Sequence, residues 1–368
     1  MRYLTIKTSA NSTYPKGGFS CSKDSFVVTQ TLVFQIKFCG KSPALRVAAK
    51  RWQKFGKNMK NIIIFLISIA LFSSCSQKTK ITYTESGSKE INGTKLYYKI
   101  IGKGEPVLII HGGPGLSHDY FLPCLISLSD KYKLIFYDQR ASGKSNLNIS
   151  PESITLENFV KDIDELRGAF GIKKLNLMAH SWGGMLAMKY ASLYPDNIKS
   201  LILVNSVGAS SEIATLSNIE IAKRFTKEDS IQRSQILNSE EFQKRSSKAI
   251  ESLMKIGFKH QFYNKSYLDS LNLSLDENYM TNSQLLQNLA KDLKNFDFHS
   301  DLETIKCPAL LIYGDYDPLT QLAAAKIHES IHNSELIVLD NCGHFPFIEK
   351  QNEFNEVLTN FMKLNKKR

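Results

Sequence analysis

The residue types that nucleophilic catalysis by a serine requires occur in this chain in a workable order. Ser181 lies between an apolar run and a helix-like segment, whereas Asp317 and His344 each follow an apolar run. A serine hydroxyl is a weak nucleophile and needs a base. A histidine can take its proton, and a carboxylate can orient the imidazole and stabilise its charged form. We predict Ser181 as nucleophile, His344 as base and Asp317 as acid; Asp315, which follows its strand more closely and would point differently, is the rival acid.

The residues around Ser181 predict a sharp turn from a strand into a helix. They follow the pattern G-x-S-x-G, with Ala179 in place of the first glycine and Gly183 in the last position. The serine backbone in such a turn is strained, and the strand passes close to the helix, so bulky neighbours two positions away would clash. The amino end of the following helix also favours negative charge that develops near the serine.

A glycine-rich turn follows an apolar run in "LIIHGGPGLSHDY" (108–120). Such a turn can cradle a phosphate, hold an oxyanion, or merely reverse the chain. The phosphate-loop spacing is absent, because "ASGKS" (141–145) has Asp138 where that motif places its first glycine. The dinucleotide spacing G-x-G-x-x-G is absent as well. The turn therefore predicts an oxyanion site, and we expect no cofactor.

The elements that must position these residues alternate between strand and helix. Continuous apolar runs, typical of strands buried on both faces, occur at 107–111, 133–138, 175–180, 200–205, 309–314 and 335–340. Helical patterns occur at 156–170, 182–193, 322–331 and 347–364. This alternation predicts a mostly parallel central sheet with helices on both faces, an α/β fold. The candidate catalytic residues then share the carboxyl edge of the sheet, where such folds bind ligands.

One long interval interrupts the alternation. Residues 206–305 contain helix-like patches at 240–254 and 283–293 but no strong apolar strand run. Their aromatic and leucine side chains are too numerous for a disordered loop. We therefore predict a helical cap at 206–305, inserted between the core segments 81–205 and 306–368.

Five motifs follow one another along the chain: "HGGPG" (111–115), "YDQRASGKS" (137–145), "AHSWGG" (179–184), "GDYDP" (314–318) and "GHF" (343–345). In this order the sequence resembles the α/β-hydrolases, and within them the prolyl aminopeptidase (proline iminopeptidase) branch, over about 91–364. The resemblance implies the α/β-hydrolase fold and an oxyanion hole formed by the backbone N–H groups of Gly113 and Trp182. It also implies a cofactor-free serine hydrolase that cleaves a small amide or ester through an acyl-enzyme.

The residues expected to select the substrate depart from that branch. The resemblance implies glutamates that recognise a free α-amine, one directly after the catalytic aspartate and another in the cap. Pro318 follows Asp317 here, and the cap stretch 283–287 contains no acid. The motifs still favour a proline iminopeptidase-like aminopeptidase acting on a small molecule or short peptide. A carboxylesterase and a non-catalytic ligand-binding lipoprotein are the alternatives.

The segment "MKNIIIFLISIALFSSCSQ" (59–77) has the pattern of a secretory signal. A positive charge precedes an apolar run that is much shorter than the about 20 residues of a membrane span. Small residues then precede Cys75, and this ending resembles the lipidation site of bacterial lipoproteins. We predict a signal peptide at 59–74, a tether at 75–80 and a lipid anchor at Cys75. The protein is then attached to the membrane of the bacterial cell envelope and faces the periplasm.

Residues 1–58 carry most of the positive charge. The net charge is +12, and this leader holds eleven Lys or Arg residues and one acid, Asp24. A signal peptide begins at the start of a chain, so we predict Met59 as the authentic start and 1–58 as a non-native upstream extension. The remaining chain is nearly neutral, and we expect no nucleic-acid partner.

Three cysteines remain beyond the signal segment, namely Cys124, Cys307 and Cys342. An odd number gives no complete disulfide framework, and their spacing matches no zinc motif. We expect free thiols and no metal site.

Overall fold

The computed structural model describes residues 6–7, 83–145 and 149–365. The predicted signal peptide, the tether and Cys75 lie outside the described residues. Within these ranges, no helix combines the length and apolar character needed to cross a membrane.

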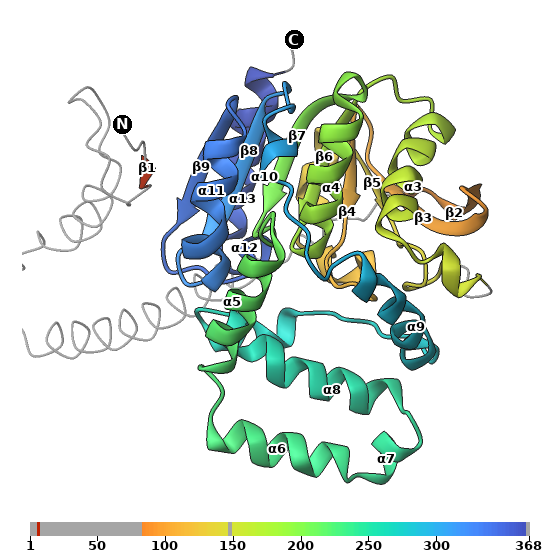
Figure 1. The fold of residues 1–368 in the computed structure, drawn as a ribbon, viewed down its shortest axis with the longest axis vertical. Helices are drawn as coiled ribbons and strands as arrows, with labels where there is room; N and C mark the ends of the chain where they lie inside the picture. Colours follow the sequence, from red (N-terminus) through yellow and green to blue (C-terminus); the bar gives the residue numbers. More distant parts are fainter. Residues whose placement is uncertain (1–5, 8–82, 146–148, 366–368) are drawn as a thin grey trace, which may run out of the picture. The chain divides into compact units, whose positions relative to one another are not determined.

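A single sheet forms the centre of the molecule (Figure 1), in the order β9-β8-β7-β6-β4-β5-β3-β2. The strands from β4 to β9 are parallel, whereas β3 pairs antiparallel with both β2 and β5. A two-residue strand, β1 (Ile6–Lys7), pairs in parallel with β9. The predicted mostly parallel sheet is confirmed. The other strands are β2 (Tyr83–Ile91), β3 (Thr94–Ile101), β4 (Glu105–Ile110), β5 (Tyr132–Tyr137), β6 (Leu175–His180), β7 (Ile198–Val204), β8 (Ala309–Gly314) and β9 (Ser334–Leu339).

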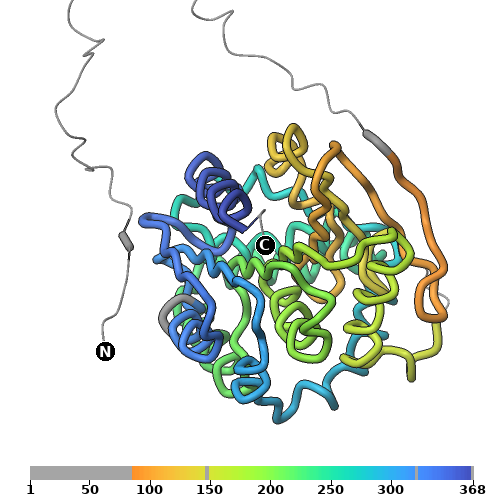
Figure 2. Tube along the Cα trace, turned by 90° about the horizontal axis from the view of Figure 1, so that it is seen from above, coloured from red at the N-terminus to blue at the C-terminus, as the bar shows by residue number. Residues whose placement is uncertain are grey.

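Both faces of the sheet are covered by helices, as the continuous apolar runs predict. In β4, Leu108 and Ile110 pack into one apolar cluster and Val107 and Ile109 into another, because successive side chains of a strand point to opposite faces. Figure 2 shows the dark blue C-terminal helix on one side of the sheet and the green helix α4 on the other. The core helices are α3 (Leu156–Ala169), α4 (Trp182–Leu193), α10 (His299–Leu302), α11 (Ala325–Ser330), α12 (Pro346–Glu349) and α13 (Gln351–Leu364).

A layer of helices lies beyond one end of the sheet, between β7 and β8 in the chain (Figure 1). We call this layer, from α5 to α9, the cap. Its helices begin at polar residues: Ser210 accepts the N–H of Ile213, and Thr226 forms a capping box with Asp229. The cap helices are α5 (Ser211–Ala222), α6 (Lys227–Leu237), α7 (Glu240–Gln243), α8 (Ser247–Phe258) and α9 (Tyr279–Leu286).

Several helices differ from the sequence-based expectation in where they stop. The pattern at 240–254 is two helices, because Arg245 has a φ of 58° and ends α7. The pattern at 347–364 is also two helices, α12 and α13, separated by Lys350, whose φ of −133° and ψ of 44° are not helical. The strand β2 was not expected; the turn Asn92-Gly93, with positive φ at both residues, closes its hairpin with β3.

Candidate active site

Ser181 lies at the turn between β6 and α4. Its φ of 53° and ψ of −121° place the backbone in the strained region typical of a nucleophile elbow. The following helix packs closely on the sheet: a Cβ on Gly183 would lie 2.6 Å from the backbone oxygen of His111 and 2.8 Å from that of Ile110. A glycine is therefore required at position 183 for this close approach of helix and sheet. Ser181 itself lies at the amino end of α4.

Asp317 and His344 lie against each other at the same edge of the sheet. Nδ1 of His344 is 2.5 Å from Oδ2 of Asp317, and both residues are almost fully buried. The carboxylate also accepts hydrogen bonds from the Asn205 side chain at 2.6 Å and from the Leu319 backbone N–H at 3.0 Å. These donors stabilise the ionised carboxylate beside the imidazole. The rival acid Asp315 instead accepts the backbone N–H of Cys342 at 3.0 Å.

Ser181, Asp317 and His344 line one cavity of about 410 Å³, which lies between the sheet edge and the cap. The same cavity is lined by Gly113 and Trp182, the two residues expected to stabilise an oxyanion. Gly113 has a φ of 127° in its turn, and Trp182 is the first residue of α4, whose N–H groups have no partner within the helix. The part of the chain that the structure describes provides no hydrogen-bond partner for either N–H.

The side chain of Gln139 connects the glycine-rich turn with α4. Its Nε2 donates to the backbone oxygen of His111 at 2.7 Å, and its Oε1 accepts the indole N–H of Trp182 at 3.0 Å. The backbone N–H of Gln139 donates to Nε2 of His111 at 3.0 Å. Burial lowers the pKa of His111 to about 4, so the ring is neutral and accepts this bond. A single buried glutamine thus bonds both to the residue that begins the glycine-rich turn and to the side chain of Trp182.

A second connection passes through Tyr120 and His180, both buried. The hydroxyl of Tyr120 accepts the N–H of Gly112 at 2.5 Å and donates to Nδ1 of His180 at 2.9 Å. The other ring nitrogen, Nε2, then carries a proton and donates to the backbone oxygen of His344 at 2.9 Å. Burial holds the pKa of His180 well below its usual value, so this ring is neutral. These three hydrogen bonds connect the glycine-rich turn, the residue before Ser181 and the loop that carries His344.

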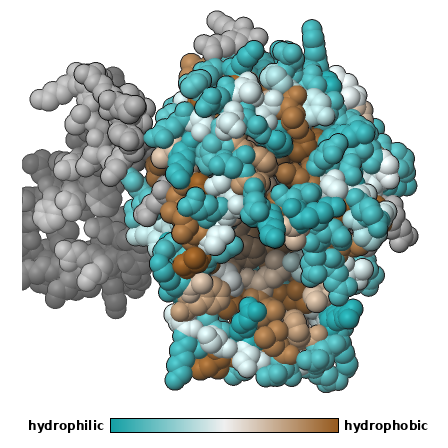
Figure 3. Space-filling model, viewed as in Figure 1, coloured by the Kyte–Doolittle hydropathy of each residue, from teal (hydrophilic) through white to brown (hydrophobic). Residues whose placement is uncertain are grey.

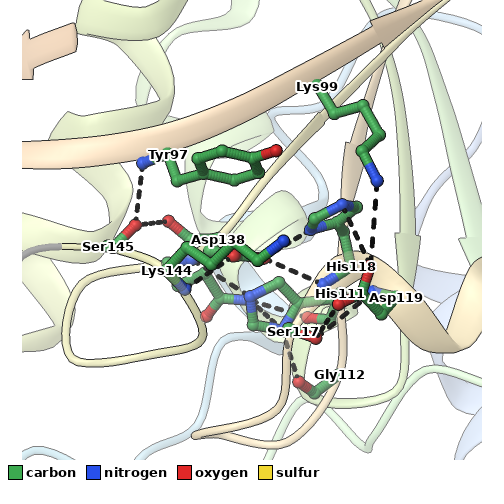
Figure 4. Close-up of polar contacts among 11 residues, drawn as sticks. Tyr97, Lys99, His111, Gly112, Ser117, His118, Asp119, Asp138, Lys144 and Ser145 are labelled. Atoms are coloured by element: carbon green, nitrogen blue, oxygen red, sulfur yellow. Dashed lines mark hydrogen bonds and ion pairs between the residues drawn. The ribbon is translucent and has the colours of Figure 1, made fainter. Parts of the chain in front are cut away.

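Behind the glycine-rich turn, a buried carboxylate organises the loop that contains "ASGKS" (Figure 4). Asp138 accepts the backbone N–H and Nδ1–H of His118, at 2.9 and 2.7 Å, and the backbone N–H of Lys144 at 2.9 Å. Ser145 donates to the backbone oxygen of Asp138 and accepts the N–H of Tyr97. Burial opposes the ionisation of Asp138, but the hydrogen bond and charge of His118 outweigh it and lower the pKa. Through Asp138 this loop supports the segment that follows the glycine-rich turn.

The cap contacts the loops that carry the candidate catalytic residues. The backbone N–H of His344 donates to the backbone oxygen of Gln261 at 2.7 Å. Arg224, after α5, donates to the backbone oxygens of Tyr316 at 2.8 Å and His260 at 3.1 Å. Its guanidinium also lies 4.1 Å from the centre of the Tyr316 ring, a cation–π distance. The cap therefore holds the backbone next to both Asp317 and His344.

In the described ranges, no group of three or more His, Cys, Asp or Glu side chains is arranged to hold a metal ion. Cys124, Cys307 and Cys342 are free thiols. Burial raises the pKa of Cys124 to about 11 and that of Cys307 to about 12, so neither is a reactive thiolate at neutral pH.

The α/β-hydrolase fold family model matches residues 105–351. The chain belongs to the α/β-hydrolase family. Proline iminopeptidases are among its relatives: that of Thermoplasma volcanium is 30% identical over 299 residues, which cover 78% of this chain and 99% of the relative. The proline iminopeptidase of Clostridium botulinum is 30% identical over 283 residues, covering 74% and 95%. These relatives support the proline iminopeptidase-like branch of the α/β-hydrolase family.

Solved structures show the same fold. An α/β fold family hydrolase from Bacillus anthracis aligns with a TM-score of 0.61 at 20% identity and covers 76% of this chain and all of that one. A proline iminopeptidase from Mycobacterium smegmatis aligns with a TM-score of 0.57 at 18% identity, covering 76% and 98%. This α/β-hydrolase thus has the fold inferred from its motifs.

Asn205, the Gln139 connection and the contact between Tyr120 and His180 were missed from the sequence. Asn205 directly follows β7 at the same sheet edge as Ser181, and this position was a usable signal for a polar partner of Asp317. The contact between Tyr120 and His180 had no comparable signal, because the two residues are far apart in the chain and meet only through the fold.

Proposed function

We propose that this protein is a serine hydrolase that cleaves a small ester or amide through an acyl-enzyme on Ser181. Oγ of Ser181 attacks the substrate carbonyl while Nε2 of His344 takes its proton. Asp317 keeps the imidazole oriented and stabilises its charged form. The observation that carries the proposal is the contact of His344 with a multiply hydrogen-bonded Asp317, in one cavity with a serine at a strained elbow.

The oxyanion that forms in this step is stabilised by the backbone N–H groups of Gly113 and Trp182. Removing one such donor typically lowers the rate by about 10²–10³. The imidazolium then gives its proton to the leaving alcohol or amine. A water molecule, deprotonated by His344, attacks the acyl-enzyme, and the collapse of the second oxyanion releases the acid and restores Ser181.

Labelling with a fluorophosphonate tests this mechanism. We expect a covalent adduct on Ser181 of the folded protein, identified by peptide mass spectrometry, and no adduct on Ser181→Ala. Serines elsewhere in the chain are the internal control. Folded protein without an adduct on Ser181 would refute the proposal and favour the non-catalytic ligand-binding alternative.

The substrate is either a peptide with a free N-terminal residue or an ester. The proline iminopeptidase relatives support an aminopeptidase. Pro318 occupies the position after Asp317 where the resemblance implies a glutamate, and this favours a carboxylesterase. Kinetics on proline and alanine arylamides beside short and long acyl esters decide between them, since an aminopeptidase requires the free amine.

We also propose that the protein is a lipoprotein of the bacterial cell envelope, anchored by lipid on Cys75 and facing the periplasm. The signal pattern at 59–74 supports this. Detergent phase partition of the native protein tests it: we expect the intact protein in the detergent phase and Cys75→Ser in the aqueous phase. Mass spectrometry of the native protein also tests the start at Met59, since a peptide from 1–58 would contradict it.

A further inference from the structure

The wall of the cavity facing Ser181 is formed largely by α5 and is uncharged. Residues spaced three and four apart on α5 share one face of the helix. The α5 residues on the cavity side include Ser211, Ala214, Thr215, Asn218 and Ile221. Figure 3 shows apolar surface along the seam between the cap and the rest of the molecule.

Among the described residues that line the cavity, Asp317 is the one carboxylate and Lys294 is the one amine. The Asp317 carboxylate is already hydrogen-bonded by His344, Asn205 and Leu319. Its charge is therefore already engaged by the imidazole of His344, which makes it a poor counter-ion for a substrate ammonium. An ammonium that enters the cavity would lose water and find no carboxylate in return, which is costly.

Several acids of the cap and its flanks have partners outside the cavity lining. Asp229 binds Lys259 and His260, and Glu220 binds Lys223. Further along the chain, Asp292 accepts the backbone N–H of Leu156, and Asp297 binds His299. None of these four acids lines the cavity, so none of them supplies the missing carboxylate.

Lys294 brings the opposite charge to the cavity. It lies beside Leu293 on the segment that follows α9, and its side chain is exposed. The ion pairs of the described residues do not include it. Its ammonium thus adds a positive charge to a cavity whose one lining carboxylate among the described residues, Asp317, is already paired with His344.

We propose that the substrate is an ester or amide without an ammonium group near its scissile carbonyl, and that it carries a remote carboxylate which pairs with Lys294. This inference rests on the proposed serine hydrolase. Because Lys294 is exposed, water and salt weaken the attraction, and we expect its loss to change the specificity constant by about two- to fivefold. The positive charge of Lys294 repels an ammonium group on a substrate.

Three p-nitrophenyl esters of equal acyl length test the inference. Pentanoate is neutral, the glutarate monoester carries a terminal carboxylate, and 5-(trimethylammonio)pentanoate carries a terminal ammonium that cannot attack its own ester. For the wild-type protein at low salt, after subtraction of the spontaneous rate of each ester, we expect kcat/KM to decrease in the order glutarate, pentanoate, 5-(trimethylammonio)pentanoate. Lys294→Gln should lower kcat/KM for the glutarate ester by about two- to fivefold and leave the pentanoate ester unchanged. Lys294→Glu should reverse the preference between the two charged esters.

Lys291→Gln is the matched control, because Lys291 is exposed on the same segment but does not line the cavity. It should leave all three values unchanged. A wild-type preference for the ammonium ester, an equal loss on all three esters in Lys294→Gln, or the same loss in Lys291→Gln would each overturn the inference while leaving the proposed hydrolase intact. If Ser181→Ala hydrolyses the neutral ester as fast as the wild type, the proposed hydrolase fails, and this inference fails with it.

Discussion

The indole N–H of Trp182 donates to the side-chain oxygen of Gln139 at 3.0 Å. The amide nitrogen of the same side chain donates to the backbone oxygen of His111, so Gln139 bonds to a residue on each side of the proposed oxyanion hole. We predict that Gln139→Leu lowers kcat by about 10–100-fold with little change in KM, less than the full loss of a donor. Steady-state kinetics on an ester substrate measure this split. A raised KM at unchanged kcat would instead show that Gln139 serves substrate binding.

Asp317 and Asp315 provide a matched pair of carboxylates. Asp317→Asn should lower kcat by about 10⁴-fold, because the amide cannot stabilise the imidazolium of His344 and favours the wrong tautomer. Asp315→Asn should have little effect, since an amide oxygen can still accept the N–H of Cys342. Turnover of an activated ester by both variants, after a check of folding by circular dichroism, measures the difference. Equal losses would reassign the acid.

Tyr120→Phe should lower the free energy of unfolding by about 1–3 kcal/mol, because it leaves the Gly112 N–H and Nδ1 of His180 buried without partners. Tyr137→Phe is the control: its hydroxyl is buried and has no partner in the described ranges, so its loss should be neutral or stabilising. Urea denaturation of the two variants measures this. A stable Tyr120→Phe would show that water replaces the hydroxyl.

Gly183→Ala should destabilise the fold or displace α4, because the added Cβ would lie within 3 Å of two backbone oxygens. Gly168→Ala is the comparison: no atom lies within 4 Å of its added Cβ, and alanine stabilises a helix by about 0.5–1 kcal/mol over glycine. Thermal unfolding should therefore move in opposite directions for the two variants. Equal shifts would contradict the close packing of the elbow.

Stability should fall as the pH is lowered from about 6.5 to about 4. Burial lowers the pKa of His111 from 6.5 to about 4 in the folded state, so the unfolded chain binds its proton first. A group that binds more protons when unfolded makes stability rise with pH, here by up to about 1.4 kcal/mol per pH unit. Urea midpoints at several pH values measure the slope. His332→Gln, at an exposed site, should leave that slope unchanged, and a flat profile in the wild type would refute the buried neutral ring.

The sheet was predictable from sequence because strands buried on both faces leave continuous apolar runs, as in β6 and β8. The elbow was predictable because β6, Ser181 and α4 follow one another directly in the sequence, with small residues on either side of the serine. The connections through Gln139 and through Tyr120 were not, because each depends on the register of strands and loops far apart in the chain. The ends of the cap helices were missed where one residue, such as Arg245, takes a left-handed conformation.

The contacts of Arg224 with Tyr316 and of Gln261 with His344 have a consequence for engineering. A cap inserted between two strands of a sheet can be regarded as a module that determines specificity and could be exchanged between hydrolases. Here the module also supports the backbone on which the acid and the base depend. A chimera that imports a foreign cap must therefore carry an equivalent of both contacts, or it changes the catalyst along with its choice of substrate.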